Sequence, residues 1–247
     1  MPSPLELTYA EAGGAALLVL AIFAGAIVQG STGFGIGLVA APLIGLVDTT
    51  LIPSTLILVT VPLPLLTGLR EMRSLEASWL GWALVGRVPG SLLGAVAVGL
   101  LSSQLLSLVA GSAVLIAVAA SLWRWQPTIN RLSLVLAGGL SGLVGTSTSI
   151  GSPPMALLMQ SKRGAQVRST LGLFFFTGTV VSLFFLTVQG QITHRHVAWA
   201  LALAIPMLIG FLVSGKLRRF VDNGRARSII LSLVAVAAAT LILTAIQ

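Results

Sequence analysis

Apolar residues fill most of this chain in long runs, and short polar gaps separate the runs. A helix that crosses the hydrocarbon core of a bilayer needs about 20 predominantly apolar residues. The runs cover residues 12–32, 33–48, 51–69, 79–101, 105–123, 132–146, 150–160, 169–189, 197–215 and 228–246. About six or seven of them are long enough to span. Three short runs, 33–48, 132–146 and 150–160, are interrupted by glycine, proline, serine and threonine. The pattern predicts an all-α, polytopic membrane bundle.

The composition supports this prediction, because only 8% of the 247 residues are charged and the mean hydropathy is +1.03. About a quarter of the residues of a soluble domain are charged. The net charge of +8 does not indicate a nucleic-acid partner, because the basic residues lie in short gaps between apolar runs. The absence of cysteine excludes disulfides, thiolate metal sites and cysteine nucleophiles. Residues 1–11 contain no Lys or Arg, unlike a secretory signal, so we expect the first apolar segment to be retained.

Basic residues gather in four of the gaps. They are Arg70 and Arg73; Arg124 and Arg131; Lys162, Arg163 and Arg168; and Lys216, Arg218, Arg219, Arg225 and Arg227. Cytoplasmic loops of membrane proteins collect Lys and Arg. Ten chain passes from an exterior N-terminus place all four gaps on the cytoplasmic side, so we expect both termini outside. The tryptophans lie near predicted helix ends, where an interfacial belt would hold them; they are Trp79, Trp82, Trp123, Trp125 and Trp199.

Two glycine-rich stretches recur about 112 residues apart (142 − 30). The first covers 30–37 and is followed by Pro42, and the second covers 142–151 and is followed by Pro153 and Pro154. At this offset Gly30 aligns with Gly142, and residues 90–94 also resemble 206–210. An odd number of passes in each copy would invert the second copy. We therefore expect residues 1–125 and 126–247 to form two five-pass inverted repeats of one membrane domain, with broken, re-entrant helices.

The interrupted segments carry the groups that an anion site needs. In inverted-repeat transporters such segments meet near the bilayer midplane. Glycine permits left-handed backbone and proline suits the start of a half-helix, whose free N–H groups attract anions. The candidate substrate-binding residues are Gln29, Ser31, Thr32, Gly33, Gly35, Gly37, Pro42, Gly145, Thr146, Ser147, Thr148, Ser149, Gly151, Pro153 and Pro154. The alternative is that the glycines permit helix packing and the hydroxyls bond to backbone.

Arg87 is a further candidate substrate-binding residue. It lies eight residues past Trp79, which is about 12 Å along a helix. An arginine at the centre of a span costs about 2.5–3.5 kcal/mol on insertion scales and usually faces a cavity or a partner. The predicted spans contain no acid to pair with it, so an anionic substrate is a candidate partner. The alternative is that Arg87 extends to the cytoplasmic interface.

The remaining polar residues do not predict an enzyme or a metal site. His194 and His196 flank Arg195 in an exterior gap, but no third metal ligand is evident, and no cofactor is indicated. No carboxylate in a predicted span offers a proton relay, so a coupling ion (H⁺ or Na⁺) and a homodimer are both left open. The alternatives to a transporter are an uncoupled anion channel or facilitator and, less favoured, a non-transporting membrane subunit.

Three stretches carry a resemblance to a known family. They are residues 33–37 with Pro42, residues 145–154 ending in Pro153 and Pro154, and Arg218 with Arg219 before the last run. They resemble the motifs of the TauE/SafE family of sulfite exporter-like membrane proteins. The resemblance implies export of sulfite, organosulfonates or related anions across the bacterial inner membrane. This chain has fewer glycines in both motifs, so the resemblance extends to the class of substrate and not to one compound.

Overall fold

The computed structural model describes residues 4–122, 127–159, 161–162 and 164–222, together with Ala235, Ala239, Ile242 and Leu243. Several sequence predictions lie outside the described residues: Trp123, Arg124, Trp125, Arg163, Arg225, Arg227, most of the run 228–246 and both chain termini. The side chains of Arg218 and Arg219 are also outside the description. The prediction about the exterior termini therefore stays a prediction.

The described chain is helical and contains no strand. Its longer helices are α1 (Pro4–Thr32), α5 (Ala77–Leu100), α6 (Ser103–Leu122), α7 (Arg131–Thr148), α9 (Gly164–Val188) and α10 (His194–Asp222). Its shorter ones are α2 (Ile36–Val47), η1 (Thr49–Leu51), α3 (Ser54–Thr60), α4 (Pro62–Arg70), η2 (Met72–Ser74) and α8 (Ser152–Met159). Among the described residues, four segments are long and apolar enough to cross a membrane, namely Gly13–Thr32, Ala77–Leu100, Gly164–Val188 and His194–Leu217. The all-helical prediction is confirmed.

The helices follow the apolar runs closely, with one difference. The run 51–69 forms two helices, α3 and α4, which are divided at Val61. Pro62 and Pro64 have no N–H, so neither can donate the usual helical hydrogen bond to the carbonyl four residues earlier. The amide of Val61 bonds instead to the carbonyl of Leu58, at 3.4 Å. The run is therefore a pair of short helices.

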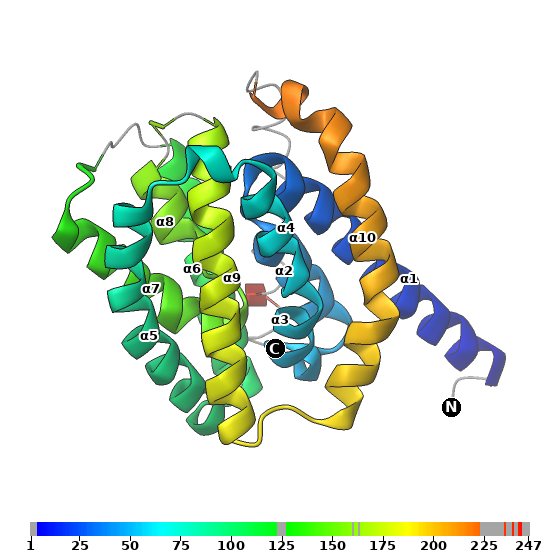
Figure 1. The fold of residues 1–247 in the computed structure, drawn as a ribbon. Helices are drawn as coiled ribbons and strands as arrows, with labels where there is room; N and C mark the ends of the chain where they lie inside the picture. Colours follow the sequence, from blue (N-terminus) through cyan, green and yellow to red (C-terminus); the bar gives the residue numbers. More distant parts are fainter. Residues whose placement is uncertain are drawn as a thin grey trace.

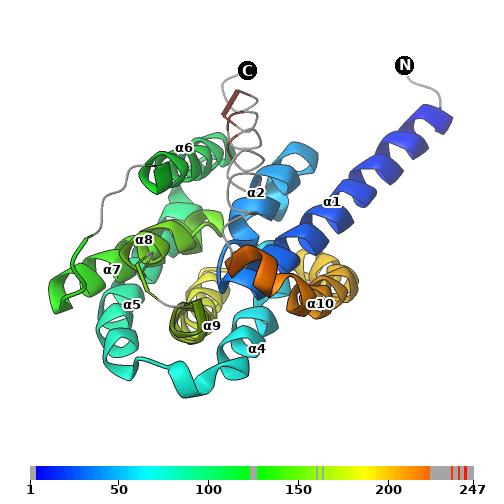
Figure 2. The same cartoon turned by 90° about the horizontal axis from the view of Figure 1, so that it is seen from above.

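Helices that are distant in sequence pack in pairs. α1 packs along α10, α5 packs along α7, and α4 packs along α9. Figures 1 and 2 both show α5, α6, α7 and α8 on one side of the bundle, α1, α2 and α10 on the other, and α9 between α5 and α4. One cluster of buried apolar residues lies on each side.

Two short segments separate consecutive helices: residues 33–35 between α1 and α2, here called the first break, and residues 149–151 between α7 and α8, here called the second break. Each break packs against the cluster on the opposite side of the bundle. Ile150, between α7 and α8, is fully buried in the cluster that α1, α2, α3, α4 and α10 build. Phe34, between α1 and α2, packs against the cluster that α5, α7, α8 and α9 build. The two breaks therefore lock the halves of the bundle together.

Glycines bring α5 and α7 into backbone contact. Gly86, Gly90 and Gly94 recur every four residues on one face of α5, and Gly138 and Gly142 do so on α7. A Cβ added at any of these five would lie closer than 3.0 Å to the backbone of the facing helix. Small residues at this spacing let membrane helices approach closely. This contact fixes the height of Arg87, which α5 carries between Gly86 and Gly90.

We expect Gly90→Ala to destabilise the protein by about 1–3 kcal/mol, the usual cost of overpacking a core. The new methyl group would overlap the carbonyl of Gly139, a backbone atom that cannot move without its helix. The measurement is the melting temperature of detergent-purified protein. Gly81→Ala is the matched control on the same helix, because no atom lies within 4 Å of the added Cβ. Equal melting temperatures for the two variants would contradict the close packing.

Candidate functional site

Each break contains left-handed backbone. α1 ends at Thr32, and Gly33 and Gly35 follow with φ of 93° and 108°. α7 ends at Thr148, and Ser149 follows with φ of 65°. Glycine adopts such angles without a Cβ clash, and a non-glycine residue there is uncommon. The predicted interruption at Gly33 is confirmed, whereas the second helix continues through Thr146 and breaks three residues later.

The two breaks touch each other. A Cβ on Gly37, in the first turn of α2, would overlap the carbonyl oxygen of Ser149. The hydroxyl of Ser149 donates to the carbonyl of Pro53 at 3.1 Å, which ties the second break to the start of α3. The N-termini of α2 and α8 therefore lie together in the interior of the bundle.

A cavity of about 60 Å³ lies at this meeting point, with room for about four water molecules. Its wall combines both breaks with α3, α4, α5 and α9. The lining residues are Gln29, Gly35, Ile36, Gly37, Leu56, Ile57, Thr60, Pro64, Arg87, Gly145, Ser149, Gly151, Ser152, Phe175, Thr179 and Ser182. The cavity is small, and its wall mixes hydroxyls with apolar side chains.

Arg87 enters the cavity wall from α5 and is only 3% exposed. Its Nη1 donates to the carbonyl and the hydroxyl of Ser141, at 2.5 and 2.8 Å. Its Nε is buried without a hydrogen-bond partner. No carboxylate among the described residues pairs with it. A buried guanidinium without a counter-ion is costly, and a negatively charged guest in the cavity would offset this cost.

Small residues make room for the guanidinium. Gly145 of α7, Gly151 of the second break and Gly178 of α9 each lie so close that an added Cβ would come within 3.0 Å of the Arg87 side chain. The Phe174 ring lies on another side, with its centroid 5.5 Å from the guanidinium carbon. The aromatic face offers a weak attraction to the cation and no charge.

Ser141 connects Arg87 to the second break. Its hydroxyl accepts from Arg87 Nη1 and donates to the carbonyl of Gly151, at 2.5 Å. Ser141 is completely buried. The position of the cation is therefore linked to the backbone that separates α7 from α8.

We expect Ser141→Ala to weaken the affinity for an anion about tenfold while leaving the maximal rate less changed, because the Arg87 guanidinium would lose the side-chain partner that positions it at the cavity wall. The measurement is the concentration dependence of anion flux in proteoliposomes. Ser141→Thr, which keeps the hydroxyl, should recover part of the affinity. A purely structural role would instead lower the melting temperature of both variants and leave the apparent affinity unchanged.

The first break is capped by Gln29. Its side-chain nitrogen donates to the carbonyl of Gly33 and its oxygen accepts from the amide of Ile36, each at 3.2 Å. The first turn of a helix leaves further amides without helical partners, and Gly37 carries one of them at the cavity wall. Pro153 and Pro154 have no N–H, so the second break offers fewer amides than the first.

The candidate residues divide into two groups. Seven of them line the cavity: Gln29, Gly35, Gly37, Arg87, Gly145, Ser149 and Gly151. Nine are not part of its described wall: Ser31, Thr32, Gly33, Pro42, Thr146, Ser147, Thr148, Pro153 and Pro154. The hydroxyls of Ser31, Thr32, Ser147 and Thr148 each donate to the carbonyl four residues earlier.

The sequence did not predict that residues of α3, α4 and α9 line the cavity. Thr60, Thr179 and Ser182 supply hydroxyl groups to the wall, and Phe175 supplies an aromatic ring. Thr177, Gly178 and Thr179 form a small polar interruption of an otherwise apolar run. That interruption is the signal that could have pointed to α9.

Ion pairs lie on both sides of the cavity along the bundle. On one side, here called the Arg168 end, Arg168 of α9 pairs with Glu71 at 2.8 Å. Arg168 Nη1 also donates to the carbonyl of Ser31 at 3.4 Å, and a Cβ on Gly33 would lie 2.7 Å from its Cα. Arg168 therefore contacts the C-terminal end of α1.

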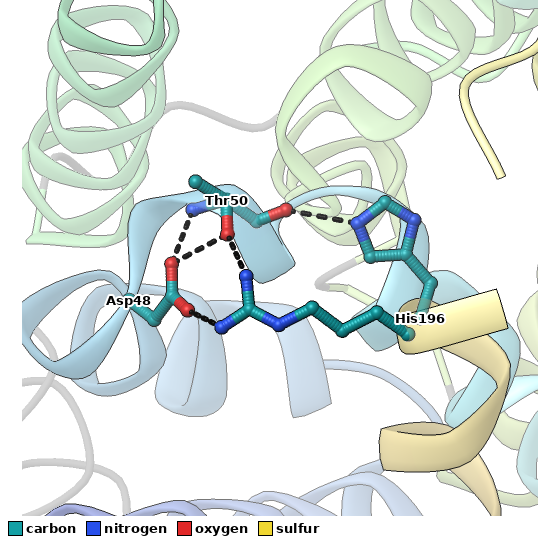
Figure 3. Close-up of polar contacts among 4 residues, drawn as sticks. Asp48, Thr50 and His196 are labelled. Carbon is teal, nitrogen blue, oxygen red and sulfur yellow. Dashed lines mark hydrogen bonds and ion pairs between the residues drawn. The ribbon is translucent and has the colours of Figure 1, made fainter. Parts of the chain in front are cut away.

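The other side, here called the Arg195 end, joins the loop after α2 to the start of α10 (Figure 3). Arg195 Nη2 pairs with Asp48 at 2.5 Å, and its Nη1 donates to the Thr50 hydroxyl at 3.1 Å. His196 Nε2 lies 3.1 Å from the carbonyl of Thr50, and its Nδ1 accepts from the amide of Thr193. Arg195 and His196 are thus engaged in this network, and the described residues contain no metal-binding cluster.

Asp48 is the carboxylate that both Arg195 and Thr50 contact at the Arg195 end. Burial raises the pKa of its carboxyl, but hydrogen bonds from Thr50 and the charge of Arg195 outweigh that effect and hold the pKa below its ordinary value of 3.8. A carboxyl with a lowered pKa stabilises the fold above the pKa of the unfolded chain, and this stabilisation is lost as the pH falls through the folded value.

We therefore expect Asp48→Asn to lower stability at neutral pH by at most about 1 kcal/mol, since the partner Arg195 is largely exposed. The deficit relative to the unchanged protein should shrink as the pH falls below the ordinary carboxyl pKa of 3.8, and it should disappear once the pH is below the lowered pKa of the folded protein. Melting temperatures measured across this pH range test the prediction. A deficit that persists in acid would show that the charge of Asp48 is not its cause.

Comparison with known proteins agrees with the motifs. The sequence model of the sulfite exporter TauE/SafE family matches residues 17–241, which is most of the chain. No curated protein and no solved structure gives a significant match. The expected resemblance is confirmed, and the four apolar helices fit a multi-pass membrane protein. The chain belongs to the sulfite exporter TauE/SafE family of membrane transporters.

Proposed function

We propose that this chain is a secondary transporter that exports a small anion of the sulfite or organosulfonate class through the cavity at Arg87. Membership of a family described as sulfite exporters supports this class of substrate. The observation that carries the proposal is the buried guanidinium, which has no carboxylate partner among the described residues and whose Nε is unbonded. A bound oxyanion would supply the counter-ion that Arg87 lacks.

We propose that residues 1–125 and 126–247 are inverted repeats that expose the cavity to each side in turn. Packing supports this arrangement: α1 lies along α10 as α7 lies along α5, and α4 lies along α9. The ends of α1 and α7 are 116 residues apart (148 − 32). The same spacing relates Phe34 to Ile150 (150 − 34), the residues that pack into opposite clusters.

We place the Arg168 end on the cytoplasmic side of the bacterial inner membrane. Arg131 lies over Trp82 and Lys162 lies over Trp79, at 5.0 and 5.4 Å, near the start of α5. Glu71 and Arg168 lie beside the same part of the bundle. Cytoplasmic loops are rich in Lys and Arg, and tryptophan favours the interface. With ten passes, this orientation puts both termini outside.

The test is flux of sulfite and methanesulfonate through purified protein in liposomes. A carrier gives saturable flux and counterflow, in which unlabelled anion on one side accelerates uptake of labelled anion from the other. Runs with a sodium gradient, a pH gradient and neither identify the coupling ion. Flux that does not saturate would favour an uncoupled channel or facilitator, and absence of anion flux would refute the proposal.

A further inference from the structure

We infer that the central site carries anions with a single negative charge and rejects dianions. This inference rests on the proposed function and adds the charge state of the substrate. Its starting point is the cavity wall. Among the residues that the structure describes, Arg87 is the only charged one in this wall. The polar side chains that share the wall, Gln29, Thr60, Ser149, Ser152, Thr179 and Ser182, are neutral donors and acceptors.

The other charged side chains of the described bundle are not part of the cavity wall. Asp48 pairs with Arg195, and Glu71 pairs with Arg168. Glu76 accepts from the side chain of Gln166 at 2.8 Å. The last apolar run, 228–246, contains no charged residue in the sequence. The described site therefore presents one positive charge to its guest.

Charge balance then selects the guest. One negative charge neutralises Arg87, whereas a dianion leaves one full negative charge uncompensated inside the bilayer. On insertion scales the cost of burying such a charge corresponds to a preference for the monoanion over the dianion of the order of a hundredfold. Neutral hydroxyls soften this penalty by hydrogen bonding and cannot remove it, because they supply no charge.

The guanidinium also has limited donor capacity for a guest. Nη1 is already occupied by the carbonyl and hydroxyl of Ser141, and Nε is buried. Only part of the guanidinium is therefore available to a guest. A cavity of about 60 Å³ favours a small ion. The substrate class is therefore small singly charged oxyanions, such as short alkylsulfonates and hydrogensulfite. An acid that loses its second proton near neutral pH would be carried in its singly protonated form.

The test compares anions of different charge in proteoliposomes. Methanesulfonate stays singly charged, sulfate stays doubly charged, and sulfite passes from one state to the other across the neutral range. We expect sulfate flux to be lower than methanesulfonate flux at the same pH by the order of a hundredfold. The ratio of sulfite flux to methanesulfonate flux should fall about tenfold per pH unit once the dianion dominates, following the fraction of hydrogensulfite.

The outcomes separate the two proposals. Sulfate flux equal to that of methanesulfonate, or sulfite flux that follows the dianion, would overturn the charge inference and leave anion transport standing. Absence of flux for all three anions would overturn both. Thr179→Lys adds a second charge to the wall and should raise the ratio of sulfate to methanesulfonate flux at least about tenfold, whereas Thr179→Gln should not. An unchanged ratio in folded Thr179→Lys would also overturn the inference.

Discussion

Replacing Arg87 with glutamine is expected to lower anion flux at least about thirtyfold, with Arg87→Ala equally inactive, because removing one side of a buried charge pair costs about 2–5 kcal/mol. The stability of anion-free protein should change by less than about 1 kcal/mol, since the variant also removes a desolvated charge that has no carboxylate partner in the described bundle. Protein levels should therefore be normal. The measurement pairs flux in proteoliposomes with the melting temperature in anion-free buffer.

Arg73→Gln is the matched control, because it makes the same chemical change at an exposed position of η2. It should leave flux and anion binding unchanged. Arg87→Lys keeps the charge and loses the planar fork, so we expect intermediate flux. Unchanged transport in Arg87→Gln would remove Arg87 from the site.

Gly37→Ala is expected to have the second-largest effect. Its methyl group would overlap the carbonyl oxygen of Ser149, and both atoms belong to backbone that is held by neighbouring helices. We expect a loss of about 1–3 kcal/mol in stability, and flux that is lower at least about tenfold because the cavity lies between the two breaks. The measurement is flux normalised to the amount of folded protein in the liposomes.

Gly139→Ala serves as its control, since the nearest atom to the added Cβ is at an ordinary 3.6 Å. That variant should keep both its melting temperature and its flux. Normal flux in Gly37→Ala would mean that the breaks do not have to touch for transport.

The helices could be predicted from the sequence because an apolar run of membrane-spanning length predicts a helix. The predicted run 12–32 and α1 end at the same residue, Thr32. The glycines at 33 and 35 indicated the first break, since they allow the positive φ that the structure has there. Arg87 was identifiable as a buried cation because it lies deep in a run that contains no acid.

The second break was harder to place, because hydroxyl residues do not themselves end a helix. Ser147 and Thr148 satisfy their hydroxyls on the carbonyls of Leu143 and Val144, and α7 continues through them. The break comes at Ser149, after which prolines start α8. The offset of about 112 in the glycine pattern thus differs from the 116 between the helix ends (148 − 32), by about one helical turn.

Contacts between distant helices were not predictable from one sequence. Ser141 reaches Arg87 only because α5 and α7 pack backbone to backbone. Thr179 and Ser182 reach the cavity because α9 lies between α4 and α5. These side chains lie in apolar runs. The local sequence pattern of such a run predicts a helix, but it does not predict which other helix packs against it.

The central claim is that an anion binds in the cavity by pairing with Arg87, and the absence of native cysteine allows a direct measurement. In Thr179→Cys the only thiol lines the cavity, and a negatively charged methanethiosulfonate reagent should modify it. The account predicts that methanesulfonate slows this modification in otherwise unchanged protein and has no effect when Arg87→Gln is added. Equal protection in both proteins, or none in either, would contradict it.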